Sequence, residues 1–280
     1  MYTNYWGLTS KPFENTPDPR FFYCSPKHEE AMMRLLYAVE ERKGSAMLSG
    51  EYGGGKTLLS RIVMAKLMQE EDKFRVALIV NPAIPSLELL GEVVYQLGGE
   101  GSKNDRKIDI LRNLNQMLYK TSGEGRHTVV IIDEAQAIED ETTFEELRLL
   151  LNFQLNEQFL LTLLLLGQPE LRMKIDNLPQ FKQRLAVRYH LTTLTEDEVR
   201  HYIEHRVRVA GKNEPIFTED AYKLIYEYSK GVPRQINNVC DLGLVIGMGH
   251  KARIIDSHII KEIIKDFQHG QDLAESVKEV

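Results

Sequence analysis

Residues 50–57 read Gly50-Glu51-Tyr52-Gly53-Gly54-Gly55-Lys56-Thr57, a complete G-x-x-x-x-G-K-[ST] phosphate loop. The loop stands between a short apolar run at 45–49 and a helical pattern at 58–68, the strand-loop-helix context that such a site requires. Its glycines let successive backbone N–H groups turn toward a phosphate chain. The helix that follows directs the positive end of its dipole at the anion. The stretch therefore predicts a nucleotide site.

Two residues at the end of this loop suit specific roles. The Lys56 ammonium can reach the terminal phosphates, and the Thr57 hydroxyl can ligate Mg²⁺. The alternative, a glycine-rich turn ahead of a helix, is disfavoured by the four fixed positions of the motif. The candidate nucleotide contacts are Gly50, Gly53, Gly54, Gly55, Lys56, Thr57 and Leu58.

A second motif follows the β-branched run at 128–132, which is typical of a buried parallel strand. Two adjacent carboxylates, Asp133 and Glu134, come directly after it. At the carboxyl end of a central strand, Asp133 can hold Mg²⁺ and Glu134 can orient or activate an attacking water. An acidic helix start is the alternative interpretation. Together with the phosphate loop, the pair favours nucleotide hydrolysis.

The composition is that of an ordinary globular protein, with 280 residues of which 42% are hydrophobic and 27% charged. A formal net charge of −6 gives no overall case for nucleic-acid binding, although a local basic patch stays open. Cys24 and Cys240 have no metal-ligand spacing and indicate a reducing compartment. The N-terminus lacks the pattern of a secretory signal, and the apolar run at 159–167 is too short to span a bilayer. We expect a soluble cytoplasmic protein.

Alternating strand and helix patterns predict a parallel sheet with helices on both faces. The first helix runs from Pro26 to about Lys43, and a loop covers 98–106. Strands are expected at 45–49, 75–81, 128–132, 159–166 and 188–193, and helices between them near 57–69, 86–98, 107–121 and 140–155.

After residue 194 the strand signals stop, and four helices are predicted. Their starts are marked by Thr195, Thr218, Pro233 and Asp256, the first within a T-x-x-E capping box. We therefore expect a nucleotide-site domain over residues 1–194 and a helical domain over 195–280. Residues 1–25, rich in aromatic residues and proline, are expected to form an ordered arm without regular structure, wrapped on the first domain.

Taken together, these motifs resemble those of AAA+ ATPases, and most closely the general secretion pathway protein A (ExeA-like) family, over almost the whole chain. The phosphate loop and the Asp-Glu pair are shared by a vast superfamily, whereas the arm and two later segments are more specific. The segments that carry the resemblance are Pro12-Phe13, the stretch from Pro17 to His28, Gly50-Glu51, Asp133-Glu134-Ala135-Gln136, Gly167-Gln168-Pro169-Glu170-Leu171, Gln183-Arg184 and Gly231-x-Pro233-Arg234-x-Ile236-Asn237.

The resemblance implies a three-layer α/β P-loop sandwich with a parallel central sheet and a small helical lid. It also implies roles for further residues. Gln168 matches the sensor 1 position, which could hydrogen-bond the γ-phosphate or the attacking water, and Arg234 matches the sensor 2 position at the start of a lid helix facing the nucleotide. Arg184 matches the arginine finger that reaches a neighbouring subunit, with Arg188 as a competitor. The arm residues Tyr23 and His28 are implied to line the adenine pocket.

The function implied is Mg²⁺-dependent ATP hydrolysis by a homo-oligomer that serves, with a protein partner, the assembly of a secretion, pilus or exopolysaccharide system. Larger family members carry a membrane segment and a peptidoglycan-binding domain after the ATPase. The sequence shows neither, so we expect the soluble, ATPase-only type. Two alternatives stay open. One is a DNA-associated ATPase similar to transposition helpers or replication initiators, and the other is a nucleotide-binding scaffold with negligible turnover. The acidic balance disfavours the first, and the intact Glu134 disfavours the second.

Overall fold

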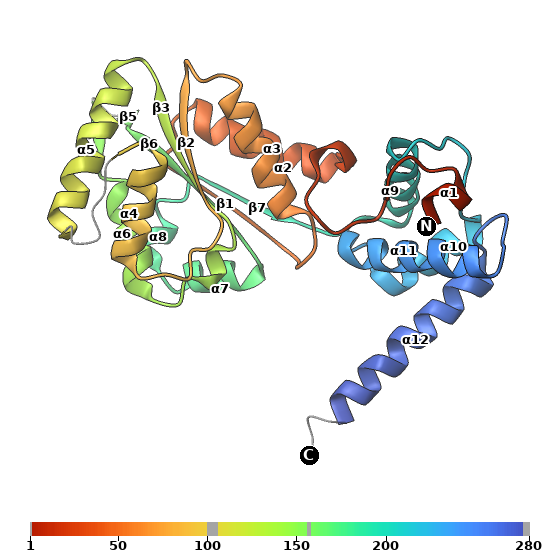
Figure 1. Cartoon of the computed structure of the whole chain (residues 1–280). Coiled ribbons are helices and arrows are strands. Elements are labelled where there is room, and N and C mark those ends of the chain that lie inside the picture. Colours follow the sequence, from red (N-terminus) through yellow and green to blue (C-terminus); the bar gives the residue numbers. More distant parts are fainter. Residues whose placement is uncertain (1, 100–105, 156–157, 277–280) are drawn as a thin grey trace. The chain divides into compact units, whose positions relative to one another are not determined.

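A five-stranded parallel sheet lies at the centre of the larger of two compact units in the computed structural model, which describes residues 2–99, 106–155 and 158–276. Contacts assign residues 26–52 and 56–191 to this larger unit, and residues 1–25, 53–55 and 192–280 to a helical unit. The strand order is β2-β3-β6-β1-β7 (Figure 1). The strands are β1 (Ser45–Gly50), β2 (Phe74–Ile79), β3 (His127–Ile132), β6 (Leu161–Gly167) and β7 (Val187–Leu191).

Helices cover both faces of this sheet, which confirms the predicted α/β fold class (Figure 1). On one face lie α2 (Pro26–Glu40) and α3 (Lys56–Met68). The other face carries α4 (Ser86–Gln96), α5 (Lys107–Gly123), α6 (Glu141–Leu150), α7 (Pro169–Asp176) and the short α8 (Pro179–Lys182). The strand residues Val129–Ile132 are completely buried, because a parallel sheet with two covered faces exposes neither side.

The predicted strands of this unit are confirmed, with ends that shift by at most two residues. The first helix ends at Glu40, earlier than expected, and Gly44 lies beyond it with a left-handed φ of 82°. A small antiparallel pair, β4 (Gln154–Leu155) and β5 (Gln158–Phe159), was not predicted, and β4 occupies the end of the helix expected at 140–155. Most of the loop expected at 98–106 lies outside the described residues.

The helical unit contains the four predicted helices, α9 (Glu196–Val209), α10 (Glu219–Ser229), α11 (Pro233–Gly249) and α12 (Ser257–Ser276). The capping box at the start of α9 is formed, because the Thr195 side chain accepts from Glu198 N and the Glu198 carboxylate accepts from Thr195 N. In the described part of the chain, no helix is both long and apolar enough to cross a membrane.

The N-terminal arm differs from its prediction in two respects. It contains a short helix, α1 (Tyr2–Trp6), and a 3₁₀ turn, η1 (Pro19–Phe21). Its contacts place it with the helical unit, because Trp6, Phe13 and Phe21 are buried in the apolar core of that unit. Burial of these large side chains against the helices, rather than local propensity, orders the arm.

Candidate nucleotide site

Three strands of the larger unit end at the same edge of the sheet, and each is followed by a residue singled out from the sequence. Strand β1 leads into the phosphate loop, β3 into Asp133 and Glu134, and β6 into Gln168. The register aligns Ser49 with Gly167 and Ile132 with Leu165. From β1 the chain crosses to β2 at one side of the sheet, whereas from β6 it crosses to β7 at the other side. The carboxyl ends of β1 and β6 therefore form a topological switch point, the place where open α/β sheets bind ligands.

The phosphate loop takes a backbone conformation that depends on glycine. Gly53 has a φ of 75° and Gly55 a φ of 95°, both in the left-handed region that side chains disfavour. Helix α3 begins directly after them at Lys56. Its first-turn N–H groups are therefore available to an anion at the loop.

Lys56 is buried, with 4% of its surface exposed. Its Nζ donates hydrogen bonds to the carbonyl oxygens of Gly50 and Glu51, each at 2.8 Å. Burial lowers the pKa of Lys56, and the carboxylates of Glu134 and Asp133 oppose that effect. A bound anion would offset the loss of hydration that the buried Lys56 ammonium suffers, so this lysine is suited to binding a phosphate.

Asp133 is 1% exposed and is held by several donors. Burial raises the pKa of the Asp133 carboxyl, and hydrogen bonds from the Thr57 hydroxyl, the Glu134 N–H and the Ser60 hydroxyl act against that rise. The Glu134 N–H lies 3.0 Å from Asp133 Oδ1, and Ser60 Oγ lies 3.3 Å from Oδ2. Ser60 was not predicted from the sequence, since a serine one helical turn after Thr57 carries no distinctive signal.

The oxygen atoms of Thr57 and Asp133 are suitable ligands for Mg²⁺. The Thr57 hydroxyl and the Asp133 carboxylate are hydrogen-bonded to each other, which brings two hard oxygen ligands together. Among the described residues, no cluster of three or more histidine, cysteine or acidic side chains could hold a metal alone. The pair of oxygens from Thr57 and Asp133 suits Mg²⁺, which is usually bound by one or two protein oxygens together with substrate phosphates and water.

Glu134 is held in an unfavourable backbone conformation, with φ 52° and ψ 35°. A left-handed conformation costs a residue with a Cβ roughly 1–2 kcal/mol, and such strain is found preferentially at functional sites. The Glu134 Oε2 atom accepts hydrogen bonds from Gln136 Nε2 at 2.6 Å and from Gln168 Nε2 at 3.2 Å. The structure therefore brings Glu134 and Gln168 together, from the ends of two different strands.

The two arginines considered as fingers lie near one another in sequence: Arg184 stands between α8 and β7, and Arg188 is the second residue of β7. Arg184 Nη2 donates to Asn152 Oδ1 at 3.3 Å, and the exposed Arg188 donates to the carbonyl oxygen of Lys182. The choice between them stays a prediction, because each would act on a neighbouring subunit.

The remaining predicted site residues are divided between the two units. His28 is buried in the larger unit. Tyr23 belongs to the helical unit, where its ring lies 6.1 Å from that of Tyr202 and 5.8 Å from that of His205. Their assignment to an adenine pocket stays a prediction.

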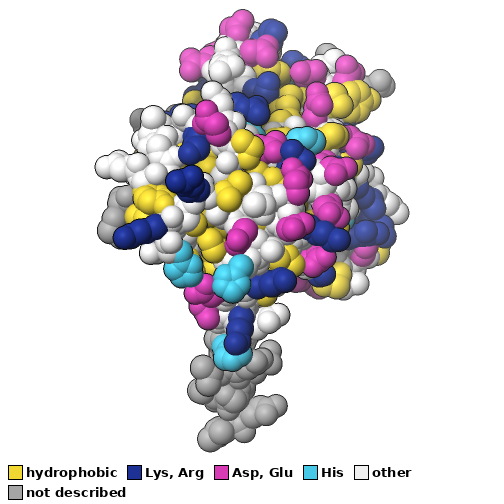
Figure 2. Space-filling view, turned by 90° about the vertical axis from the view of Figure 1, so that its right-hand side faces the viewer, with side chains coloured by type: hydrophobic (Ala, Val, Ile, Leu, Met, Phe, Trp, Pro, Cys, Tyr) yellow, Lys and Arg dark blue, Asp and Glu magenta, His cyan; other side chains and the backbone are white. Residues whose placement is uncertain are grey.

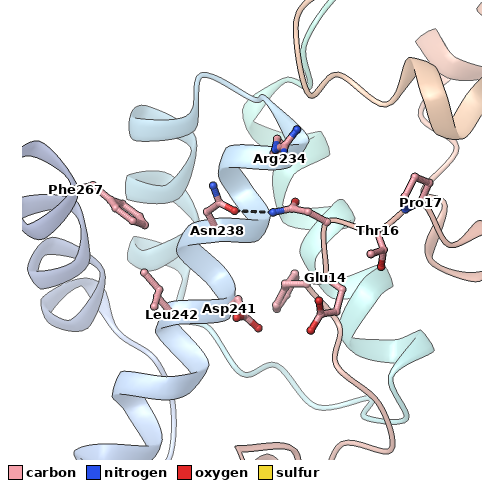
Figure 3. Close-up of a pocket in the computed structure, with 10 residues that line it drawn as sticks. Glu14, Thr16, Pro17, Arg234, Asn238, Asp241, Leu242 and Phe267 are labelled. Carbon is pink, nitrogen blue, oxygen red and sulfur yellow. Dashed lines mark hydrogen bonds between the residues drawn. The ribbon is translucent and has the colours of Figure 1, made fainter. Parts of the chain in front are cut away.

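Arg234, the second residue of α11, borders a pocket of about 570 Å³ within the helical unit (Figure 3). One wall of the pocket is the arm segment 13–17. The arm is joined to α11 there, because Asn15 Nδ2 donates a hydrogen bond to Asn238 Oδ1 at 2.7 Å. Leu242 and Phe267 form the apolar side of the pocket, on α11 and α12. The role of Arg234 as sensor 2 also stays a prediction.

Comparison with known proteins agrees with this geometry. Residues 39–175 match the AAA domain family. Among solved structures, the Aeropyrum pernix ORC1 protein in complex with DNA aligns with a TM-score of 0.68 at 15% identity, covering 96% of this chain and 72% of that one. The Thermotoga maritima RuvB Holliday junction branch migration motor aligns at 0.53 and 18% identity, covering 85% of this chain and 68% of that one. The chain thus has the AAA+ fold, with a parallel P-loop core and a helical part.

A curated relative narrows this class. The chain is 36% identical over 248 residues to general secretion pathway protein A of Aeromonas hydrophila. The match covers 88% of this chain and 44% of the relative, so the chain spans less than half of that protein. The resemblance inferred from the sequence is confirmed, and the chain is an AAA+ protein of the general secretion pathway protein A (ExeA-like) family.

Proposed function

We propose that this protein is a Mg²⁺-dependent ATPase that acts in the assembly of a secretion, pilus or exopolysaccharide system of the cell envelope. One observation carries the enzymatic part of the proposal. A carboxylate suited to activating water, Glu134, is held next to Gln168 at the edge of the sheet where β1 leads into the phosphate loop. A binding module without turnover has no need of such a carboxylate.

The residues divide the work of hydrolysis among them. Lys56 and the loop N–H groups bind the phosphate chain, and Thr57 and Asp133 hold Mg²⁺, which when bound neutralises charge on the phosphates. Glu134 accepts a proton from the water that attacks the γ-phosphorus, and the bond from that phosphorus to the bridging oxygen breaks to release ADP. Gln168 donates to the γ-phosphate or orients the water.

The envelope role is supported by the relative's name alone, and the chain spans 44% of that relative. The proposal includes a homo-oligomer, since AAA+ sites of this kind are completed by an arginine from a neighbouring subunit. Whether Arg184 or Arg188 supplies that charge is part of the proposal and is tested below.

The DNA-associated alternative has less support. The solved structures that mention DNA are at most 18% identical to this chain, and at that level they carry the fold alone. The net charge is −6, and on the face that Figure 2 shows, basic and acidic side chains are interspersed rather than gathered by sign. A protein that binds DNA through phosphates would show affinity that falls steeply with salt. Tight, salt-dependent binding to duplex DNA would therefore favour this alternative.

The ATP site is tested by removing its lysine. Lys56→Ala should reduce the binding of a fluorescent ATP analogue and the Mg²⁺-dependent release of phosphate to background, because it removes the cation at the phosphates. Lys66→Ala, an exposed lysine on the same helix, is the matched control and should behave as wild type. Normal turnover in a folded Lys56→Ala protein would refute the site.

A further inference from the structure

Gln136 bridges the ends of two strands of the sheet. It lies in the 3₁₀ turn η2 (Ala135–Ala137), directly after the Asp133-Glu134 pair. Its Nε2 donates to Glu134 Oε2 at 2.6 Å, and its Oε1 accepts from the backbone N–H of Gln168 at 2.9 Å. The same Glu134 oxygen accepts from Gln168 Nε2 at 3.2 Å. Glu134, Gln136 and Gln168 therefore close a ring of three hydrogen bonds.

The partners of Gln136 determine the orientation of its amide. The backbone N–H of Gln168 is a donor and needs an acceptor, whereas the Glu134 carboxylate is an acceptor and needs a donor. Rotating the amide by 180° would set donor against donor at one end and acceptor against acceptor at the other. Only the observed orientation satisfies both neighbours, so the side chain is specified by the site.

Two neighbouring residues, Lys174 and Gly167, accommodate this turn. Lys174 on α7 donates through Nζ to the carbonyl oxygens of Gln136 at 2.7 Å and Ile138 at 2.6 Å. At the end of β6, a Cβ on Gly167 would lie 2.6 Å from Gln136 Oε1, so the absence of a side chain there leaves room for the amide. The η2 turn is thus held by Lys174, and the end of β6 leaves space for the Gln136 side chain.

We propose that Gln136 is a positioning residue that sets the Glu134 carboxylate for water activation and couples it to Gln168. This inference rests on the proposed ATPase function and adds a residue to which no role was given. Gln136 does not itself touch ATP or water in this account. It acts through Glu134, whose strained backbone and long side chain need a second anchor to hold one direction.

The ring has a further consequence for the response to nucleotide. If Gln168 turns its amide to the γ-phosphate, it gives up its hydrogen bond to Glu134. Gln136 then becomes the anchor of the carboxylate while still holding the Gln168 backbone. A shift at the end of β6 is in this way transmitted to the base at the end of β3.

The test replaces Gln136 with methionine, which keeps the length of the side chain and removes its hydrogen bonds. In Gln136→Met, kcat should fall about 10- to 100-fold because a displaced catalytic group loses its alignment. KM and the affinity for a fluorescent ATP analogue should change by no more than roughly twofold, since the interaction serves the transition state. Gln69→Met, the same change at an exposed glutamine after α3, is the matched control and should leave kcat unchanged.

A second variant separates positioning from a structural role. Gln136→Glu keeps an oxygen to accept from the Gln168 N–H but places a second carboxylate against Glu134. If Gln136 served only to hold the end of β6, this variant would remain active. Because two carboxylates at this distance repel, we expect kcat to fall at least as far as in Gln136→Met.

A double-mutant cycle tests whether Gln136 acts through Glu134. In a Glu134→Gln background, Gln136→Met should produce little further loss of kcat, because residues that act as one unit are not additive. Wild-type kcat in Gln136→Met, an active Gln136→Glu, or equal losses in both backgrounds would overturn the assignment. So would a loss of the native unfolding transition in every Gln136 variant, which would make the residue structural. The ATPase proposal itself is tested without any Gln136 variant, by comparing turnover in wild type and Glu134→Gln. Absence of Glu134-dependent turnover in the wild type would refute it.

Discussion

His127, the first residue of β3, is a buried titratable group outside the nucleotide site. It is 3% exposed, and its Nε2 lies 2.8 Å from Thr162 Oγ1 on β6. Burial lowers the pKa of His127 to about 4, and the positive charge of Arg42 acts in the same direction. The folded protein therefore keeps this imidazole neutral at pH values where the unfolded chain protonates it.

The stability of the larger unit should depend on pH through this residue. The unfolded histidine gains a proton below about pH 6.5 and the folded one only below about pH 4, so stability falls as pH falls between these values. The full difference corresponds to about 3 kcal/mol of unfolding free energy. Urea unfolding at pH 7 and pH 4.5 should show a smaller pH dependence in His127→Gln than in wild type. The exposed His258→Gln is the control, and equal pH dependence in wild type and His127→Gln would contradict the account.

At the scale of elements, the N-terminal arm is attached to α9 and α11 by a polar network that centres on the buried Arg206. The Arg206 guanidinium, on a residue only 6% exposed, donates to the carbonyl oxygens of Pro12 and Glu14 and to the Tyr202 hydroxyl. The Tyr202 hydroxyl donates to Asn237 Oδ1 at 2.8 Å, and Asn237 Nδ2 donates to Asn15 Oδ1 at 3.1 Å. The asparagine of the G-x-P-R-x-I-N segment thus has a structural task, holding the arm.

Breaking this network should release the arm. Arg206→Met removes the donor to the buried Pro12 carbonyl and Tyr202 hydroxyl and to the Glu14 carbonyl, and each buried group left unsatisfied costs about 1–3 kcal/mol. Backbone amides of residues 8–25 should exchange with deuterium faster, and the helical unit should unfold at lower temperature. The exposed Arg208→Met on the same helix is the control. Unchanged exchange in the arm of Arg206→Met would show that aromatic packing alone holds it.

The elements that the sequence could predict are those whose signal is local. The apolar run at 128–132 and the phosphate loop between an apolar run and a helical pattern led directly to β3, β1 and α3. Helix α1, five residues long, carries too short a pattern, and it forms because Trp6 packs into the helical unit and donates through Nε1 to the Leu244 carbonyl. The task of Gln136 depends on β6 lying between β3 and β1, an order that no local pattern contains.

At the scale of the whole molecule, turnover should depend on assembly. An arginine finger supplied by a neighbour is worth about 10³ to 10⁵ in rate. The specific activity should therefore rise with protein concentration, and Arg184→Ala should bind ATP almost normally but hydrolyse it poorly. Mixing Arg184→Ala with Lys56→Ala should restore some activity, where an intact Arg184 meets an intact Lys56. If proven co-assembly restores nothing, Arg188→Ala takes the place of Arg184→Ala in the same mixture. Activity that is independent of concentration, down to a demonstrated monomer, would contradict a finger supplied in trans.

We propose that this chain hydrolyses ATP with Glu134 as the base. The most direct measurement is Mg²⁺-dependent phosphate release by wild type and Glu134→Gln, with ATP affinity measured on the same samples. The account predicts steady release by wild type, and near-wild-type ATP affinity with release about 10² to 10⁴ times slower in Glu134→Gln, because the amide keeps the shape of the side chain and loses its basicity. Equal release by the two proteins at equal bound ATP would contradict it.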